Sequence, residues 1–535
     1  MQIKRLRIND YLCLVDFNIH FTTIHGGSST ILIGENGAGK STILETILEI
    51  FVSFDSPAIE KEISYSYEIE YNYAEKEIKI TQDNHRYRIT IDGTSIEGDF
   101  HLVNIYLKDS RFFSSRIVTF YSGSNDKLLP KLRNPNMYYK KRCRHTIAEF
   151  LKEMNAEGEG TIPNFPTRKY IHMNDELTPV YLTAILCGHE SFEKKYLNGT
   201  CKISKVSSAN LCINVDMAEA FFGRAQFEGN HPTGLYYLSD YIDHRFTDAL
   251  RRGFLYSDRG KAYFELHEIE RLNIDSIAIL NYFEKLATLF DTHFDVTVLQ
   301  DETEIKCAQL SEGQRQLIKV LGMLGVCKSE DCLVLMDEPD AHMNPKWKYE
   351  IKEIIDEVLK QSTNTQAIIA THDPLVINGV SKEFIRIITC DNKYEFTKVI
   401  EPDTMTEGMG IDGLLQSEYY GLPTVLDSET KKKLDKKHDL LIKDKSGEIT
   451  DSEATELKEL TEELENMTFS RNIPTDIYYD EYVAAMHKIY SARPVVKLTK
   501  EDIEERNAMA EKILRDILEK HKNESIAQKK KAEAY

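Results

Sequence analysis

The sequence GENGAGKS, from Gly34 to Ser41, combines residue types that could bind phosphate. It fits the pattern G-x-x-x-x-G-K-[ST], in which glycines let backbone N–H groups curl around phosphate oxygens and a lysine reaches the β- and γ-phosphates. A short apolar strand at 31–33 precedes the motif and an amphipathic helix follows it, which argues against a chance glycine-rich turn. We therefore predict a P-loop that binds ATP, with Ser41 as a ligand of Mg²⁺ and with the nucleotide-contacting residues Gly34, Glu35, Asn36, Gly37, Ala38, Gly39, Lys40, Ser41 and Thr42.

Two carboxylates and one histidine follow buried strands later in the chain. Asp337 and Glu338 come after the wholly apolar run 332–336, and His372 comes soon after the apolar run 366–370. Such runs are typical of parallel strands that are covered on both faces, and ligands bind at the carboxyl ends of these strands. The plain alternatives are two solvated carboxylates and a loop histidine whose ring is satisfied locally. Their position favours a site for the carboxylates and leaves both interpretations of His372 open.

The order of these motifs resembles that of the ABC ATPase superfamily. The sequence LSEGQRQ, at 310–316, matches the signature motif, the run ending in Asp337-Glu338-Pro339-Asp340 matches Walker B with its D-loop, and His372 matches the H-loop. The resemblance implies an α/β fold: an ABC-type P-loop ATPase head with a mostly parallel core sheet and an antiparallel β-subdomain. It also implies ATP and Mg²⁺ as cofactors.

The resemblance assigns a role to each matching residue. Asp337 would hold Mg²⁺ through water, Glu338 would orient and polarise the attacking water, and His372 would sense the γ-phosphate. The signature loop would contact the ATP bound to the P-loop of a partner head, through Ser311, Gly313 and Gln314. The active site would then be complete only when two heads close on two nucleotides, which predicts a homodimer or a higher oligomer.

The composition is typical of a globular protein in a reducing compartment. The 535 residues include 67 Lys+Arg and 87 Asp+Glu, which gives a net charge of −20, and 41% of them are hydrophobic. The nine cysteines contain no CxxC pair, which argues against a structural zinc site. No stretch approaches the roughly 18 apolar residues of a membrane span, and the N-terminus lacks the apolar segment of a signal peptide. We expect a cytoplasmic protein that makes no membrane contact.

The residue patterns divide the chain into four segments. Alternating apolar residues at 63–91, broken by turn residues, predict an antiparallel meander, whereas the patterns weaken beyond 126 and the end of the chain is highly charged and helical. We predict the first half of the head with the P-loop and the antiparallel β-subdomain at 1–125, an inserted and mostly helical lobe at 126–294, the second half of the head at 295–425, and a charged helical C-terminal extension with a short hairpin at 426–535.

The length of the chain and the order of its motifs indicate which group of the superfamily it resembles. A transporter subunit would have nearly half this length and would lack the large insertion, so the split head instead resembles the SMC, RecF and overcoming-lysogenization-defect group. No long heptad region exists for an SMC arm, and no Toprim-like nuclease domain follows residue 390. One departure concerns the glutamine of the Q-loop, which is not evident. Asn125 is the candidate for its place.

The resemblance that covers most of the chain is to the ATPases of Septu-type antiphage systems, including those attached to retrons. It rests on the P-loop half and on the segments TFYSGSND, LSEGQRQ, LMDEPDAHMNP and GMGIDGLLQSEYYGLPTVLD. It implies an ATP-hydrolysing subunit whose head dimerisation controls a separate HNH nuclease and, in retrons, one that works with a reverse transcriptase and its RNA–DNA hybrid. The alternative is a RecF/SMC-like DNA-repair ATPase that clamps DNA by itself. No intrinsic nuclease is expected, because no further metal-ligand cluster is evident.

Two further stretches are candidate partner surfaces. The segment 127–145 is basic and contains no acid, with Lys127, Lys131, Arg133, Lys140, Lys141, Arg142 and Arg144. It could bind nucleic acid, or it could be a solvated face paired with acidic neighbours. Aromatic and Met side chains at helical spacing within 473–490 could dock the nuclease or a second copy of the chain, or could pack against the protein's own head.

Overall fold

The computed structural model of the protein describes residues 1–23, 27–55, 62–109, 116–122, 126–157, 168–189, 191–214, 244–258, 261–272, 274–289, 292–329, 331–360, 362, 364–391, 396–422, 424–446, 449–465, 482, 485–486 and 505–517. The chain forms two compact units. The first contains residues 1–377 and 383–401, and the second contains residues 378–382 and 402–535.

A seven-stranded sheet forms the centre of the first unit, with the strand order β18-β17-β3-β16-β15-β8-β9. The strands are β18 (Phe396–Ile400), β17 (Ile385–Asp391), β3 (Ser28–Ile33), β16 (Gln366–Thr371), β15 (Cys332–Asp337), β8 (Arg116–Tyr121) and β9 (Tyr170–Met173). Every pairing is parallel except that of β17 with β18. Each residue of β3, β15 and β16 is buried, which confirms the predicted parallel sheet that is covered on both faces.

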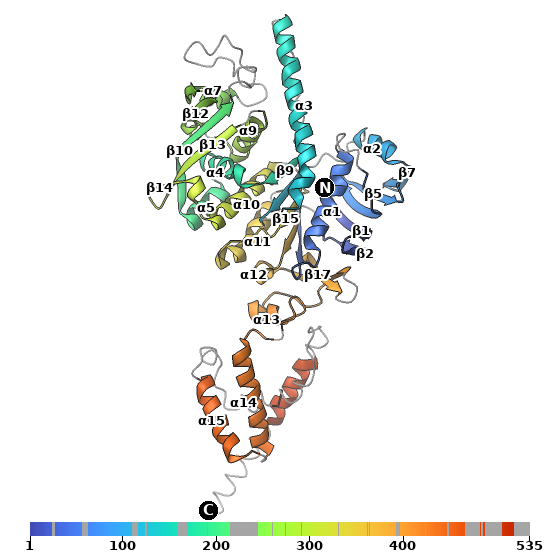
Figure 1. Ribbon diagram of the computed structural model, residues 1–535, viewed down its shortest axis with the longest axis vertical. Coiled ribbons are helices and arrows are strands. Elements are labelled where there is room, and N and C mark those ends of the chain that lie inside the picture. The colour runs from blue at the N-terminus through green and yellow to red at the C-terminus, as the bar shows by residue number, and fades with distance from the viewer. Residues whose placement is uncertain are drawn as a thin grey trace, which may run out of the picture. The chain divides into compact units, whose positions relative to one another are not determined.

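A six-stranded antiparallel sheet, with the order β2-β1-β4-β5-β6-β7, packs against the helix that follows the P-loop. Its strands are β1 (Gln2–Tyr11), β2 (Leu14–His20), β4 (Tyr67–Tyr73), β5 (Lys76–Asp83), β6 (Arg86–Ile91) and β7 (Thr94–Gly98). Rings of the helix α1 (Lys40–Asp55) meet rings of this sheet: Phe51 lies 5.5 Å from Tyr71 and Phe54 lies 6.0 Å from Tyr87, centroid to centroid. The predicted meander is confirmed, and one core joins both sheets through α1 (Figure 1).

The inserted lobe contains a sheet that the sequence prediction missed. Helices α3 (Leu128–Glu157), α4 (Thr178–Cys187), α5 (Phe192–Cys201), α7 (His244–Arg252), α8 (His267–Glu270) and α9 (Ser276–Leu289) do lie here. They accompany a five-stranded antiparallel sheet, β11-β12-β10-β13-β14, made of Phe254–Asp258, Lys261–Glu265, Ile203–Asn214, Thr292–Gln300 and Thr303–Lys306. The longest strand, β10, carries register shifts against β13, and such bulges break the two-residue alternation that would have revealed it.

Helices of the second half of the head flank the central sheet. Helix α10 (Glu312–Ser329) follows the signature sequence and contacts α4 and α9 of the lobe, and α11 (Pro345–Leu359) contacts β3. The N-cap of α11 is Asn344, whose Oδ1 accepts the N–H of Trp347 at 3.0 Å, as the sequence predicts. The short helix α12 (Pro374–Ile377) ends the first of the two segments that make up the first unit, and the second segment begins at Glu383.

The second unit contains residues 378–382 and continues from Pro402, so it includes residues that precede the predicted C-terminal extension at 426–535. It contains α13 (Gly410–Gln416), followed by an antiparallel hairpin of α14 (Ser428–Ser446) and α15 (Asp451–Glu465), and residues 505–517 are also helical. Ion pairs cross the hairpin, from Lys433 to Glu463 at 2.7 Å and from Lys443 to Glu453 at 2.6 Å. Most of the predicted docking face at 473–490 lies outside the described residues. Among the described helices, none is both long and apolar enough to span a bilayer.

Candidate functional site

The P-loop occupies the turn between β3 and α1, and its glycines are required by the backbone. Gly34, Gly37 and Gly39 have φ values of 155°, 84° and 101°, which side chains rarely allow. A Cβ at Gly34 would lie 1.9 Å from the carbonyl oxygen of Ile388, and one at Gly39 would lie 2.5 Å from Oγ1 of Thr397. The loop is therefore pressed against β17 and β18, which fixes its curvature.

Lys40 is the buried cation of the site, with a side chain that folds back over its own loop. Its Nζ donates to the carbonyl oxygens of Gly34, at 2.7 Å, and Glu35, at 3.0 Å, and the residue is only 6% exposed. Burial lowers the pKa of Lys40, while the nearby charges of Glu338 and Asp337 act to raise it. The ammonium group thus lies between the phosphate-binding loop and the two acids.

Asp337 and Ser41, the two predicted metal ligands, are brought together at the end of β15. The Ser41 hydroxyl is hydrogen-bonded to the Asp337 carboxyl, which is 2% exposed. Burial, and then the neighbouring Glu338, raise the pKa of Asp337 to about 6, against the opposing effects of Ser41, Lys40 and Lys127. A hydroxyl and a carboxylate are the oxygen ligands that Mg²⁺ prefers, so this pair fits the predicted ion.

Glu338 and His372 face each other across the ends of two neighbouring strands. His372 Nδ1 lies 2.9 Å from Glu338 Oε1, and both side chains are partly exposed. Glu338 has a φ of 51°, and its N–H donates to the carbonyl oxygen of Ala370 at 2.8 Å. A non-glycine residue in this conformation is held there by its surroundings, as is common at functional sites. The contact fixes the His372 ring relative to the Glu338 carboxylate.

The signature residues lie against the loop that follows Walker B in the same chain. Ser311 Oγ accepts the N–H of Gln314 at 3.2 Å, and Gln314 Oε1 accepts the N–H of Ser311 at 2.9 Å, which is a capping box that begins α10. A Cβ on Gly313 would lie 2.7 Å from the carbonyl oxygen of His342. Ser311 is exposed. The structure thus fixes the signature loop on the D-loop and leaves its serine at the surface.

The chain around the predicted Q-loop connects the acids to helix α3. Asn125 itself lies outside the described residues, but the Ser122 hydroxyl before it donates to the carbonyl oxygen of Glu338. Asp126, after it, caps α3 by accepting the N–H groups of Leu128 and Leu129 at 2.9 and 3.0 Å. Both flanking residues therefore belong to the site region, which the sequence alone did not reveal.

A buried hydrogen-bonded chain holds Asp126 in place. Its Oδ2 lies 2.8 Å from His172 Nε2, and His172 Nδ1 lies 2.9 Å from Thr119 Oγ1 on β8. Burial acts to raise the pKa of Asp126, but the hydrogen bond and charge of His172 and the two backbone N–H groups lower it below its usual value. The first turn of α3 is in this way tied to the strands beside Walker B.

Two supports of the P-loop come from segments distant in sequence. Thr397 Oγ1 donates to the carbonyl oxygen of Ala38 at 2.9 Å, and the Thr397 N–H donates to the carbonyl oxygen of Cys13 at 2.7 Å. Neither residue belongs to a motif, and nothing in their local sequence could have pointed to them. They hold the loop between the turn from β1 to β2 and the strand β18.

The sheet order and the arrangement of these motifs define the class of the protein. A P-loop follows β3, two acids end β15, a histidine follows β16 and a signature loop begins α10. The chain therefore has the fold of a P-loop ATPase head. A family model described as "AAA ATPase domain" matches residues 1–184, and one described as "AAA domain, putative AbiEii toxin, Type IV TA system" matches residues 213–378.

Comparisons with known proteins add two relatives. The chain is 30% identical over 162 residues to the "Retron Vc95 probable ATPase" of Vibrio cholerae serotype O1 biovar El Tor, an alignment that covers 28% of this chain and 30% of the relative. It is 27% identical over 124 residues to the "Septu protein PtuA" of Bacillus mycoides (strain KBAB4), covering 22% of this chain and 17% of the relative. The chain thus spans less than a third of the length of either relative.

Among solved structures, the SMC head domain from Thermotoga maritima is similar over 76% of this chain and 100% of its own, at 12% identity and a TM-score of 0.32.

Proposed function

We propose that this chain is the ATP-hydrolysing subunit of an antiphage defence complex of the Septu or retron type. The observation that carries the ATPase part is the convergence of Lys40, Ser41, Asp337, Glu338 and His372 at one edge of the central sheet. The defence part is supported by the similarity to a retron ATPase and to a Septu protein. Control of a partner HNH nuclease is the regulatory role that we assign to ATP-dependent pairing of two heads.

Each residue would act at a definite point of the reaction. The P-loop N–H groups and Lys40 would bind the β- and γ-phosphates, and Ser41 and Asp337 would hold Mg²⁺, which neutralises phosphate charge when bound. Glu338 would accept a proton from the attacking water and keep it aligned with the γ-phosphate. His372, hydrogen-bonded to Glu338 at 2.9 Å, would orient that carboxylate and respond to the γ-phosphate.

Head pairing is proposed because the signature serine lies at the surface. Ser311 is exposed at the start of α10, where the positive end of the helix dipole favours an anion. In a symmetric pair, this helix end would meet the ATP held by the partner's P-loop. Hydrolysis would then depend on protein concentration.

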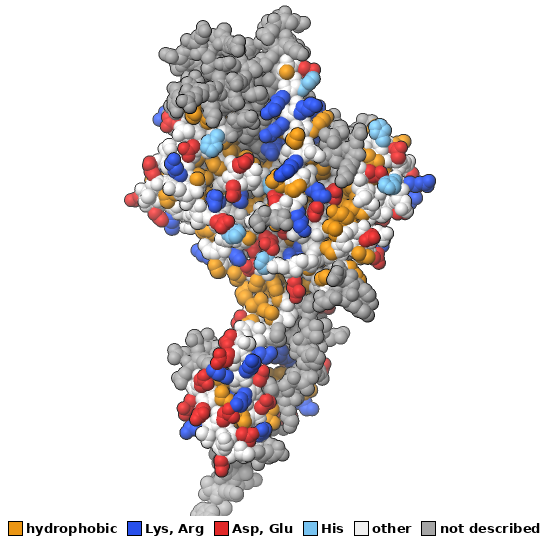
Figure 2. Space-filling model, viewed as in Figure 1, with side chains coloured by type: hydrophobic (Ala, Val, Ile, Leu, Met, Phe, Trp, Pro, Cys, Tyr) orange, Lys and Arg blue, Asp and Glu red, His pale blue; other side chains and the backbone are white. Residues whose placement is uncertain are grey.

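A basic face on α3 supports a nucleic-acid partner and also favours the alternative of a DNA-repair ATPase. Lysine and arginine side chains follow α3 in Figure 2. Arg133, Lys140, Lys141 and Arg144 are all exposed. Lys131, in contrast, is paired with Glu45 at 3.2 Å and Glu49 at 3.1 Å, so it stabilises the packing of α3 on α1. We restrict the proposed nucleic-acid contact to the exposed residues of this face, which we call the α3 basic face.

One experiment tests the proposed function against the alternative. The tagged chain is expressed with its neighbouring reading frames, and the purified complex is weighed by native mass spectrometry with ATP and with the Glu338→Gln variant, which should hold ATP in closed heads. We expect two copies of the chain and a separate nuclease. A chain that binds duplex DNA and copurifies with no nuclease would favour the repair ATPase, and a chain that stays monomeric in every nucleotide state would contradict head pairing.

A further inference from the structure

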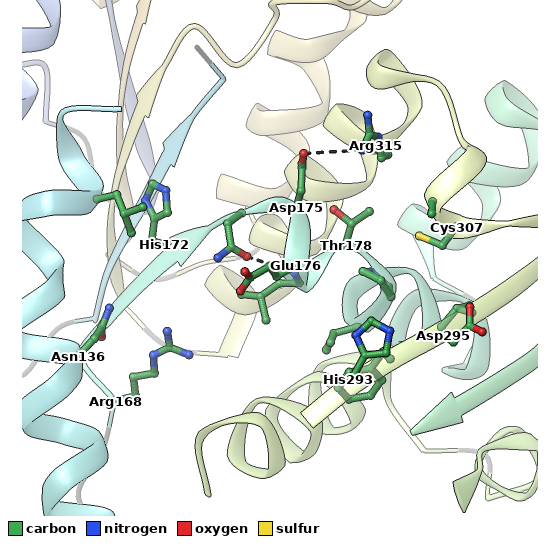
Figure 3. A pocket seen from close by; sticks show the side chains of 18 of the residues that line it. Asn136, Arg168, His172, Asp175, Glu176, Thr178, His293, Asp295, Cys307 and Arg315 are labelled. Atoms are coloured by element: carbon green, nitrogen blue, oxygen red, sulfur yellow. Dashed lines mark hydrogen bonds and ion pairs between the residues drawn. The ribbon is translucent and has the colours of Figure 1, made fainter. Parts of the chain in front are cut away.

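A cavity of about 780 Å³ lies between helix α3, the start of α4 and the strand β13 (Figure 3). Its volume falls within the range of about 300–1,000 Å³ that is typical of small-molecule sites. No residue of the P-loop or of Walker B lines it, so this cavity is distinct from the phosphate-binding loop, although Arg315 of the signature sequence reaches its wall. It has one wall on α3, which also carries the α3 basic face.

A buried hydroxyl without a partner marks the wall formed by α4. Thr178 lines the cavity and is 1% exposed, and its Oγ1 has no hydrogen-bond partner. Leaving such a group unpaired costs free energy, so native structures rarely keep one unless a ligand or water completes it. Thr178 is also the first residue of α4 and follows the 3₁₀ turn Asp175–Leu177, so its own N–H already donates to the carbonyl oxygen of Asp175. The unpaired hydroxyl is therefore the group of Thr178 that can donate to an anion.

Cationic side chains surround the same space. Lys140 lines the cavity from α3, and its ammonium group forms no hydrogen bond or ion pair with the residues that the structure describes. Arg168 lies near α3 in Figure 3, and its Nε donates to the carbonyl oxygen of Tyr170 at 3.1 Å. His293 contributes an imidazole from β13. A phosphate group bound here would therefore meet charge-assisted donors from several elements.

Two of the acids in the wall are already neutralised by basic neighbours. Asp175 lies 2.7 Å from Lys319 Nζ and 3.8 Å from an Arg315 guanidinium nitrogen, and Asp295 lies 4.0 Å from Lys306 Nζ. Lys319 and Lys306 do not line the cavity, so they add positive charge from behind the wall. The balance of charge around the cavity thus allows an anionic ligand.

The remaining walls suit a flat, partly polar ring. Apolar side chains line one part of the cavity: Leu177, Pro179, Val180, Phe294 and Val296. Asn136 on α3 and Glu176 before α4 also line it, and an amide and a carboxylate together offer the donors and acceptors that recognise the edge of a nucleobase. A phosphate, a ring and hydrogen-bonding ring substituents are combined in a nucleotide.

We propose that this cavity binds one nucleoside monophosphate unit, either a free nucleotide or the terminal nucleotide of a nucleic-acid strand. The phosphate would lie near Thr178, with Lys140 and Arg168 adding positive charge from the α3 side of the cavity, and the base would pack against the apolar wall. Lys140 also belongs to the α3 basic face, so a strand held along α3 could place its end in the cavity. This second source rests on the nucleic-acid partner in the proposed function, whereas the free nucleotide does not.

Occupancy of this cavity has a direct structural route to the signature helix. Arg315 lines the cavity, lies in the first turn of α10 and pairs with Asp175 at 3.8 Å. A bound phosphate would compete with Asp175 for the Arg315 guanidinium and would so alter the contact that holds the start of α10.

Calorimetry on the full chain tests the proposal with the P-loop filled by saturating ADP and Mg²⁺. The probes are AMP, CMP, GMP and UMP for the free ligand, and a short oligonucleotide with a 5′-phosphate or a 5′-hydroxyl for the strand end. Thr178→Val removes the hydroxyl at nearly constant shape and should weaken binding about tenfold, and Lys140→Ala should weaken it about threefold. Lys141→Ala is the matched control, because Lys141 is exposed beside Lys140 but does not line the cavity.

The monophosphate probes and the oligonucleotide probes distinguish a free nucleotide from a strand end. Tight binding of a monophosphate assigns a free nucleotide, and binding of only the 5′-phosphorylated strand assigns a strand end. The proposal is overturned if no probe binds at millimolar concentration, or if Lys140→Ala and Lys141→Ala change the affinity equally. ATP hydrolysis by the same Lys140→Ala protein, measured without added monophosphate or oligonucleotide, reports on the proposed function separately, because an empty cavity leaves the contact between Asp175 and Arg315 in place.

Discussion

The pKa values of two carboxylates in this chain are shifted in opposite directions. One is Asp337 at the proposed ATP site, and the other is Glu453 in the helical hairpin of α14 and α15. Asp337 is buried, and burial raises its pKa to about 6. Glu453 stands at the surface, where hydrogen bonds from Lys443 and then Thr450 lower its pKa to about 2. The surroundings of Asp337 destabilise its charged form, whereas the surroundings of Glu453 stabilise its charged form.

The difference shows how the two regions use charge. At the proposed ATP site, Lys40 and Asp337 are buried away from water. The free energy of each charge therefore depends on the opposite charges beside it and on the charge of a bound ligand. In the hairpin, the ion pairs are solvated, and water replaces any partner that is removed. Substitutions should therefore have large effects on function at the first region and small effects on stability at the second.

The largest effect is expected for Lys40→Ala. The variant should lose ATP binding by at least about 100-fold, because the P-loop backbone would retain no buried cation for the β- and γ-phosphates. Binding of a fluorescent ATP analogue measures this loss. Lys443→Ala in the hairpin is the control and should bind ATP as the unmodified chain does. Equal affinity of the two variants would remove Lys40 from the site.

Ser311→Arg should abolish hydrolysis while leaving ATP binding intact. The added bulk and positive charge would lie at the exposed start of α10, which is proposed to meet the partner's nucleotide, while the P-loop of the same chain is unchanged. Mixing this variant with Lys40→Ala should restore at most one working site per dimer. Steady-state ATPase rates at several protein concentrations provide the measurement, and a variant that hydrolyses ATP at the unmodified rate would contradict head pairing.

Asp337→Asn should make the nucleotide-free chain more stable at pH 8 but unable to bind Mg²⁺-ATP. The folded state raises the pKa of Asp337 to about 6, so above that pH the buried charge destabilises the fold, and the penalty disappears as the pH falls towards the unfolded value of about 4. A gain of about 1–3 kcal/mol in the free energy of unfolding is expected at pH 8 and almost none at pH 4. Denaturant titrations at both pH values give the comparison. A loss of stability at pH 8 would show that Asp337 is held by partners stronger than the burial that opposes them.

The smallest effect is expected for Lys443→Ala in the hairpin. Its ion pair with Glu453 is 2.6 Å long, but the Lys443 side chain is 49% exposed. Removing it should leave the melting temperature of the chain unchanged within error, since water solvates the released carboxylate. Differential scanning calorimetry tests this expectation. A clear drop in melting temperature would mean that the hairpin depends on its charges as much as the ATP site does.

The sequence predicted the parts of the site whose signal is local. GENGAGKS between a strand and a helix, and the acids after an apolar run, need only neighbouring residues to be recognised, and the structure places Lys40, Ser41 and Asp337 together. The supports from Thr397 and Cys13 were beyond prediction, because they depend on how β18 and the turn from β1 to β2 reach the loop.

The inserted lobe was the least predictable region. Its strand β10 mixes small and polar residues and shifts register against β13, so its alternation is interrupted where a regular pattern would be needed. Lys131 was assigned to a basic surface, but its pairing with Glu45 and Glu49 on α1 requires knowledge of helix packing. The roles of the site residues and the partner surfaces remain predictions.

Helix α3 extends far from the proposed ATP site, although its first turn is connected to that site. It runs from Leu128 to Glu157 as one helix, so at 1.5 Å per residue it is about 45 Å long. Its cap, Asp126, lies four residues beyond Ser122, which bonds to the backbone of Glu338. A tilt of about 5° at the first turn of α3 would move the far end by about 4 Å, which is close to the rise of about 3.4 Å per base pair in duplex DNA, because the displacement grows with the length of the helix. A rearrangement of bond-length size at the acids could in this way become a movement large enough for another macromolecule to detect.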